Sequence, residues 1–144
     1  MSERHRSEFA IDPRYARVLG LFGVRPDRAS VTFDDTSLRV RFGFWRFATE
    51  LSNIDRVCIT GPYASALRAI GPHISLADRG LSFCTNTDLG ACVLFRSPVP
   101  TRATLGLLKH PGLTLTPQDP RGFAEALTAA RDAARASPND PTSD

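Results

Sequence analysis

Apolar and polar residues alternate in two adjacent runs near the middle of the chain, 37–42 and 45–51. Alternation with a period of two is typical of a β-strand that buries one face. Gly43 lies between the two runs, and a glycine permits the tight reversal that joins antiparallel strands. The sequence therefore predicts a β-hairpin whose turn is formed by Gly43 and Phe44. The residues expected to point inward are Leu38, Val40, Phe42, Trp45, Phe47 and Leu51.

Shorter apolar runs bounded by turn residues continue this pattern on both sides of the hairpin. They predict strands at 31–33, 54–60, 73–77, 81–85, 91–96 and 113–116. No crossover helices separate these runs, and parallel neighbours in a sheet require such connections. We therefore expect a mainly β, antiparallel arrangement.

A short helix is predicted before the first of these strands. Asp12 can accept hydrogen bonds from the free backbone N–H groups at a helix start, and Pro13 suits the first helical position. Apolar residues then follow with helical spacing and form one stripe: Tyr15, Val18, Leu19 and Phe22.

A longer amphipathic helix is predicted near the C-terminus. Asp119 and Pro120 provide an N-cap and a first helical residue of the same kind. Arg131 and Arg135 fall near the end of this helix, where the helix dipole favours cations. One side of the helix carries Phe123, Leu127, Ala130 and Ala134.

These elements predict a β-rich α+β fold, an antiparallel barrel or strongly bent sheet that buries its apolar face. Phe123 and Leu127 would then plug one open end of the barrel. The length of 144 residues fits a single domain, which we place at 9–136. We expect residues 1–8 to be a flexible N-terminus and residues 137–144 to be a disordered tail.

Several segments are similar to a bacterial family with a pleckstrin-homology-like (PH-like) domain. They are Trp45–Ile54, Ser75–Leu81 and His110–Thr114, followed by Asp119 and Pro120. The resemblance spans roughly residues 9–130 and implies strands followed by one capping helix. The family carries no agreed activity, so the resemblance indicates no particular function. A helix-grip fold, with a curved sheet around a long C-terminal helix, is the alternative.

The charge and the cysteines limit the classes of function. The net charge is +3, but the arginines are dispersed among acids along the whole chain, which is unlike the focused basic stripe of a nucleic-acid-binding protein. No run is long enough for a membrane helix, and the start lacks the apolar core of a secretory signal. Cys58, Cys84 and Cys92 lie in apolar runs, which indicates buried free thiols. We therefore expect a cytoplasmic protein.

The sequence offers little that could carry catalysis. The motifs Gly-x-Ser-x-Gly and Ser-x-x-Lys are absent, and no cysteine pair has CxxC spacing. The histidines, His5, His73 and His110, show no metal-ligand spacing and are expected to lie on the surface or to form hydrogen bonds. We expect neither an enzyme nor a metal or other cofactor.

Arg39, Arg41 and Arg46 are the best candidates for a binding site. If Gly43 and Phe44 form the turn, Arg41 lies directly opposite Arg46 on the polar face of the hairpin. Two like charges in such a pair are unfavourable without a counter-charge, which either Glu50, a neighbouring acid or a bound anion must supply. Phosphoinositide-binding PH domains use an Arg-x-Arg in the second strand, which Arg39 and Arg41 match. The basic residue that ends their first strand has no equivalent here, because Asp34 and Asp35 occupy that loop.

Three functions remain open. The first is a non-catalytic binding or interaction module whose partner is another protein or a second copy of the chain. The second is a helix-grip binder of a small apolar ligand, which requires an internal cavity. The third is weak binding of an anion or a phospholipid headgroup through Arg39, Arg41 and Arg46, although a membrane surface is the less expected partner.

Overall fold

The computed structural model describes residues 4–61, 71–74, 81–86, 88–100 and 109–136. For residues 71–74 it describes the backbone alone. The predicted tail at 137–144, most of the strand predicted at 73–77 and the side chain of His73 lie outside the described residues.

The first sheet contains the predicted hairpin. Its strands are β1 (His5–Glu8), β2 (Ala29–Phe33), β3 (Ser37–Phe42) and β4 (Trp45–Glu50), hydrogen-bonded in that order and antiparallel throughout. Arg41 is the Cα partner of Arg46, which confirms the predicted register and the turn at Gly43 and Phe44. The first strand was not expected, because His5–Glu8 falls in the segment predicted to be flexible. It pairs with β2, and the His5 ring stacks on Phe33 at 4.6 Å.

The second sheet contains β5 (Ile54–Thr60), β6 (Gly71–Ile74), β7 (Leu81–Cys84), β8 (Gly90–Pro100) and β9 (Lys109–Leu115). Its strand order is β5-β8-β9-β7-β6. Strand β9 lies between β8 and β7 and runs parallel to β7. The expectation of antiparallel pairing therefore fails at this one pair of described strands, where the chain passes through β8 before returning beside β7.

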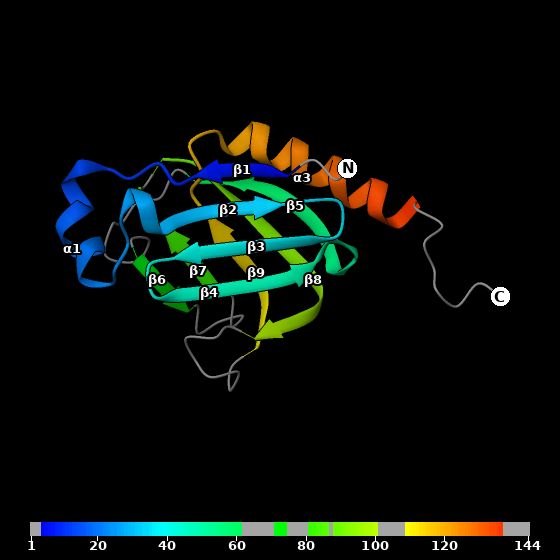
Figure 1. Cartoon of the computed structure of the whole chain (residues 1–144), viewed down its shortest axis with the longest axis horizontal. Coiled ribbons are helices and arrows are strands. Elements are labelled where there is room, and N and C mark those ends of the chain that lie inside the picture. The colour runs from blue at the N-terminus through cyan, green and yellow to red at the C-terminus, as the bar shows by residue number, and fades with distance from the viewer. Residues whose placement is uncertain (1–3, 62–70, 75–80, 87, 101–108, 137–144) are drawn as a thin grey trace.

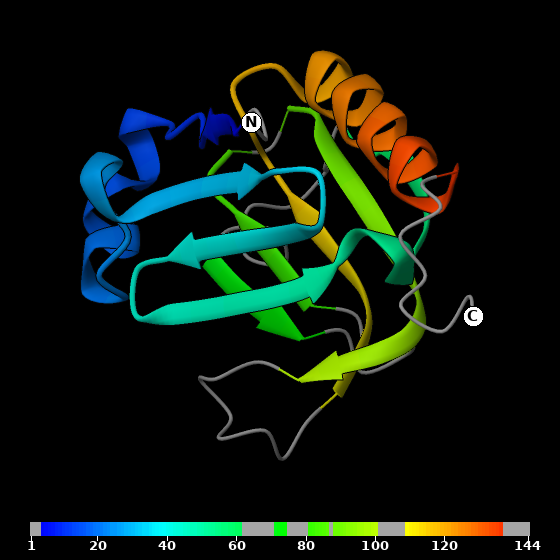
Figure 2. The same ribbon diagram turned by 45° about the vertical axis from the view of Figure 1, so that its right-hand side comes forward.

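The two sheets face each other as separate layers, with β1–β4 in front of β5–β9 in Figure 1 and crossing them in Figure 2. The sequence predicted a β-rich α+β fold with either a barrel or a strongly bent sheet. The β-rich fold with a C-terminal helix is confirmed, but the described residues form two sheets with no ladder between them and so no closed barrel. A 3-10 turn at Leu51–Asn53 separates β4 from β5, and Leu51 is fully buried there. The chain changes layers at this turn instead of continuing the hydrogen bonding around a barrel.

Aromatic rings fill the space between the layers. Phe42 of β3 stacks on Phe83 of β7 at 4.7 Å, and Phe47 of β4 stacks on Phe95 of β8 at 5.3 Å. All four side chains are buried. Such ring pairs add to the hydrophobic free energy that holds the layers together.

The N-terminal helix forms as a 3-10 turn at Pro13–Tyr15 followed by α1 (Ala16–Leu21). The Asp12 carboxylate accepts the backbone N–H of Arg14 at 2.9 Å, as the predicted cap requires. The predicted apolar stripe is confirmed for Leu19, which is buried, and for Tyr15, which packs against the core, but Val18 and Phe22 are exposed. The helix lies at one end of the layers and presents one residue to the core (Figure 1).

The C-terminal helix α3 (Pro120–Ala136) forms where the sequence predicts it. Asp119 accepts the backbone N–H of Gly122 at 3.0 Å and so caps the helix start. Phe123 and Leu127 are buried, and the Phe123 ring meets Phe33 at 6.1 Å. With no barrel mouth to plug, the helix packs along one edge of the layers, against β5, the turn at Leu51–Asn53 and β8.

Candidate anion-binding groove

The structure brings Arg39, Arg41 and Arg46 together on the outer face of the first sheet. Residues that alternate with the buried Leu38, Val40 and Phe42 must point away from the core, and all three arginines are exposed. Arg39 lies two residues before Arg41 on the same strand, and Arg41 lies opposite Arg46 on the next. The three guanidinium groups therefore rise from neighbouring positions of one surface.

These arginines line a groove with a volume of about 640 Å³. Ser30 and Thr32 of β2 contribute hydroxyl groups to its wall, and they are the Cα partners of Arg41 and Arg39. Ala48 lines the groove on the β4 side with a small side chain. Pro100, at the end of β8, lines it from the other sheet. The lining thus combines three cations and two hydroxyl groups with four apolar residues: Val40, Phe47, Ala48 and Pro100.

Arg39 and Arg41 form no ion pair with a carboxylate of the described residues. Glu50, one of the predicted counter-charges, pairs with Ser37 in the register and lies at the far end of β4 from Arg46. Glu8, at the other edge of the sheet, is 3.6 Å from Arg6. We call the directly opposed Arg41 and Arg46 the like-charge rung. Neither Glu50 nor Glu8 supplies its counter-charge.

The Asp34 carboxylate stabilises the turn between β2 and β3, near Arg39. Asp34 accepts the backbone N–H groups of Thr36 at 2.8 Å and Ser37 at 2.9 Å. These hydrogen bonds lower the pKa of Asp34 to about 2, with a smaller contribution from the charge of Arg39. Asp34 serves the turn at the end of β2 and does not line the large groove.

An exposed apolar surface lies beside the groove, and we call it the tip: Val18, Leu21, Phe22 and Phe44. Leu21 is 81% exposed and Phe44 is 67% exposed, although both are large apolar side chains. The two segments that form the tip touch, since the backbone N–H of Phe44 donates to the carbonyl of Phe22 at 3.4 Å. Clustered exposed apolar residues often mark a contact surface.

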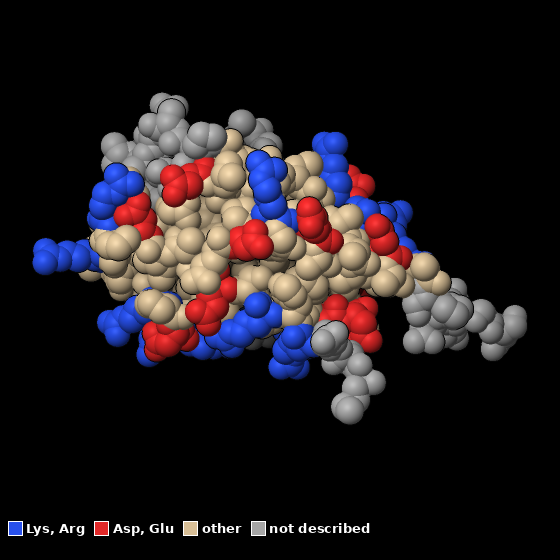
Figure 3. Space-filling view, turned by 90° about the horizontal axis from the view of Figure 1, so that it is seen from above, with Lys and Arg blue, Asp and Glu red and all other residues tan. Residues whose placement is uncertain are grey.

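Several cations lie on the segments that carry the tip or follow it. Arg17, Arg25 and Arg28 are exposed there, and the rung of Arg41 and Arg46 is next to the hairpin turn. In Figure 3, blue side chains project from the end of the molecule where α1 lies, with red acidic side chains among them. Sequence analysis missed the tip, because Val18 and Phe22 match a buried helical stripe and Phe44 reads as a turn residue.

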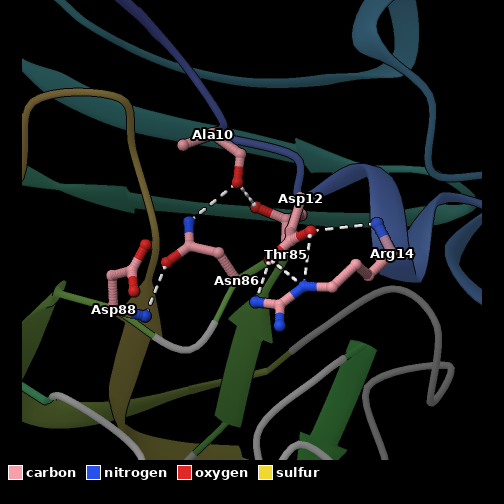
Figure 4. Close-up of polar contacts among 6 residues, drawn as sticks. All are labelled: Ala10, Asp12, Arg14, Thr85, Asn86 and Asp88. Atoms are coloured by element: carbon pink, nitrogen blue, oxygen red, sulfur yellow. Dashed lines mark hydrogen bonds and ion pairs between the residues drawn. The ribbon is translucent and has the colours of Figure 1, made fainter.

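A second polar cluster has a structural explanation (Figure 4). The carbonyl of Ala10 accepts hydrogen bonds from Thr85 Oγ1 at 2.6 Å and Asn86 Nδ2 at 2.7 Å. The Asp12 carboxylate pairs with the Arg14 guanidinium at 2.8 Å, and this partner holds the pKa of Asp12 below its usual value. The cluster fastens the segment before α1 to the end of β7.

The remaining candidate groups do not form a reactive centre within the described residues. No group of His, Cys, Asp and Glu side chains there could hold a metal ion. Burial raises the pKa of the Cys84 thiol to about 12, so this thiol stays protonated. The prediction of buried thiols fails for Cys58, which is exposed, and Cys92 is half-buried. His5 is exposed and His110 is buried.

Comparison with known proteins identifies no relative. No family model, no curated protein and no solved structure matches this chain. Among the described helices, none has the length and apolar character needed to span a bilayer.

Proposed function

We propose that this protein is a non-catalytic binding module and that its ligand presents an anionic group to Arg39, Arg41 and Arg46. The observation that carries the proposal is the like-charge rung of Arg41 and Arg46 in a groove where Arg39 and Arg41 have no acidic partner among the described residues. An anion in the groove would offset this repulsion. Directly opposed like charges in an antiparallel pair are unfavourable unless a counter-charge lies nearby.

A phosphate or a phosphate ester suits this site best. A guanidinium group presents parallel N–H donors that match two oxygens of a phosphate, and three such groups surround the groove. The hydroxyl groups of Ser30 and Thr32 add donors that need no charge. Because the arginines are exposed, the binding should weaken as salt increases.

The binding test uses inorganic pyrophosphate as the probe and calorimetry at low salt. We expect saturable binding by the wild type and at least a tenfold loss of affinity in Arg41→Gln/Arg46→Gln. The matched control is Arg56→Gln/Arg121→Gln, which removes the same charge at exposed positions outside the groove. Equal loss in both double variants would show that net charge alone attracts the probe and would contradict the proposal.

A phosphate could belong to a soluble ligand or to a lipid headgroup, and the tip separates these two sources. Co-sedimentation with phosphatidylcholine vesicles, with and without phosphatidylserine, is measured for the wild type and for Phe44→Ser. If a lipid is the source, the anionic vesicles bind the wild type, and Phe44→Ser binds them less because an exposed apolar ring no longer enters the interface. If the source is soluble, pyrophosphate binds and vesicles do not.

The packing between the layers and the exposed tip bear on the other functions predicted from the sequence. The ring contacts between the layers favour a ligand on the surface over an apolar ligand held between the sheets. The exposed tip supports the prediction of a protein partner or self-association. Sedimentation velocity tests self-association, and a monomer at all concentrations would count against it. The relationship to PH-like domains also stays a proposal, supported by the β-rich fold with its C-terminal helix.

A further inference from the structure

Two cysteines that are 34 positions apart in the sequence face each other across the second sheet. Cys58 of β5 is the Cα partner of Cys92 of β8, in a continuous antiparallel register from Arg56 to Thr60. Residues directly opposite in such a pair project to the same face of the sheet. Cys58 is exposed, and Cys92 is half-buried between the buried Ala91 and Val93, so both side chains point away from the core.

We propose that Cys58 and Cys92 form a thiol pair that a peroxide oxidises to an intramolecular disulfide linking β5 to β8. Directly opposed residues in an antiparallel pair have Cα atoms about 4.5 or about 5.5 Å apart. Disulfides join Cα atoms roughly 4.4–6.8 Å apart, so the Cα separation of either kind of pair lies within the range that a disulfide joins.

The reaction is balanced with hydrogen peroxide as the oxidant. The Cys58 thiolate attacks one peroxide oxygen and breaks the O–O bond, which gives a sulfenic acid and hydroxide. The Cys92 sulfur then attacks the Cys58 sulfur, forms the S–S bond and displaces hydroxide, which takes up a proton to become water. Two thiols and one peroxide thus give one disulfide and two waters.

The third cysteine cannot take the place of either partner. Cys84 lies on β7, and β9 separates β7 from β8 in the sheet. Neighbouring strands are about 4.8 Å apart, so Cys84 is about twice that distance from Cys92 across the sheet. Cys84 is also buried, whereas Cys58 on the edge strand is open to a dissolved oxidant. The sheet therefore selects one of the three pairings that three cysteines allow.

The test is oxidation of the dilute native protein with hydrogen peroxide, followed by alkylation of the remaining thiols and peptide mapping. Trypsin together with a protease that cuts before Asp separates the three cysteines into peptides 57–68, 80–87 and 88–96. We expect peptides 57–68 and 88–96 to be joined, with a loss of about 2 Da that a dithiol reverses. The Cys58→Ser variant, altered at an exposed position, should give no joined peptides.

Oxidation in concentrated urea shows which cysteines pair when the chain is unfolded and the sheet is absent. We expect the unfolded chain to give a mixture that includes Cys84, and the native protein to give the Cys58–Cys92 link alone. The same mixture in both conditions would overturn the proposal. Native oxidation that yields disulfide-linked dimers or a sulfinic acid at Cys58 in place of the link would also overturn it.

Discussion

Gly43 is the residue on which the hairpin depends most. Its φ of 60° lies in the left-handed region, and a Cβ at this position would lie 2.3 Å from the carbonyl oxygen of Phe22. A side chain there is strained by its backbone conformation and by contact with a rigid atom. The glycine thus joins the β3–β4 turn closely to the end of α1.

Replacing this glycine should be costly. We expect Gly43→Ala to lower the free energy of unfolding by about 2 kcal/mol or more, measured by urea denaturation. Gly20→Ala is the matched control, because a Cβ at Gly20 meets no heavy atom within 4 Å and alanine favours a helix. Equal destabilisation by both changes would contradict the assigned turn.

Asp34 makes the stability depend on pH at the next turn. Its folded-state pKa of about 2 lies below the usual aspartate value of 3.8, so its stabilising effect is complete above about pH 4. The effect is lost as the pH falls through about 2. We expect Asp34→Ala to reduce the unfolding free energy by about 1 kcal/mol at pH 7, where the charged carboxylate accepts two backbone N–H groups.

The difference between wild type and Asp34→Ala should shrink as urea denaturation is repeated at lower pH. Asp35→Ala is the control, since Asp34 and not Asp35 accepts these hydrogen bonds from the turn. A difference that stays constant from pH 7 to pH 2, or one that also appears for Asp35→Ala, would show that the Asp34 charge does not hold the turn.

At the scale of elements, α3 covers the edge of the second sheet. Arg131 donates to the carbonyl oxygen of Asp55, and Arg135 donates to that of Ile54. The register between β5 and β8 shifts between Ile54 and Arg56, so the start of this edge strand departs from a regular ladder. The sequence predicted these arginines as charges that complement the helix dipole. The structure shows in addition that they donate hydrogen bonds to backbone carbonyls at the start of β5.

Removing both arginines should loosen the helix from the sheet. We expect Arg131→Ala/Arg135→Ala to lower the unfolding free energy by about 1–3 kcal/mol, because hydrogen bonds from charged donors are lost. Hydrogen exchange at α3 and at the start of β5 should become faster. Arg121→Ala, at an exposed position early in the same helix, is the control. Unchanged exchange in the double variant would contradict this role.

Local patterns and long-range pairing differ in how well the sequence reveals them. The β3–β4 hairpin and the start of α3 follow from alternation, a glycine and an Asp-Pro cap, which act over a few residues. The parallel pairing of β7 and β9 joins segments about thirty residues apart, and no local pattern encodes it. The closed barrel failed for the same reason, because Leu51 continues an alternating run yet ends the strand in a buried turn.

At the scale of the whole molecule, only the arginines of the candidate groove were predicted as site residues. Arg39, Arg41 and Arg46 share a face because of the hairpin register alone. Ser30 and Thr32 join them through the β2–β3 pairing, and Pro100 arrives from the other sheet. These contributions, like the pairing of Cys58 with Cys92, depend on contacts that the three-dimensional fold creates.

The measurement that tests the central claim most directly is a titration of the labelled protein with inorganic pyrophosphate at low salt, followed by NMR of the arginine Nε–Hε groups. The account predicts saturable shifts at Arg39, Arg41 and Arg46, with smaller changes at the exposed Arg56 and Arg121 outside the groove. Shifts of similar size at all exposed arginines, or none at these three, would contradict the claim that the groove binds an anion.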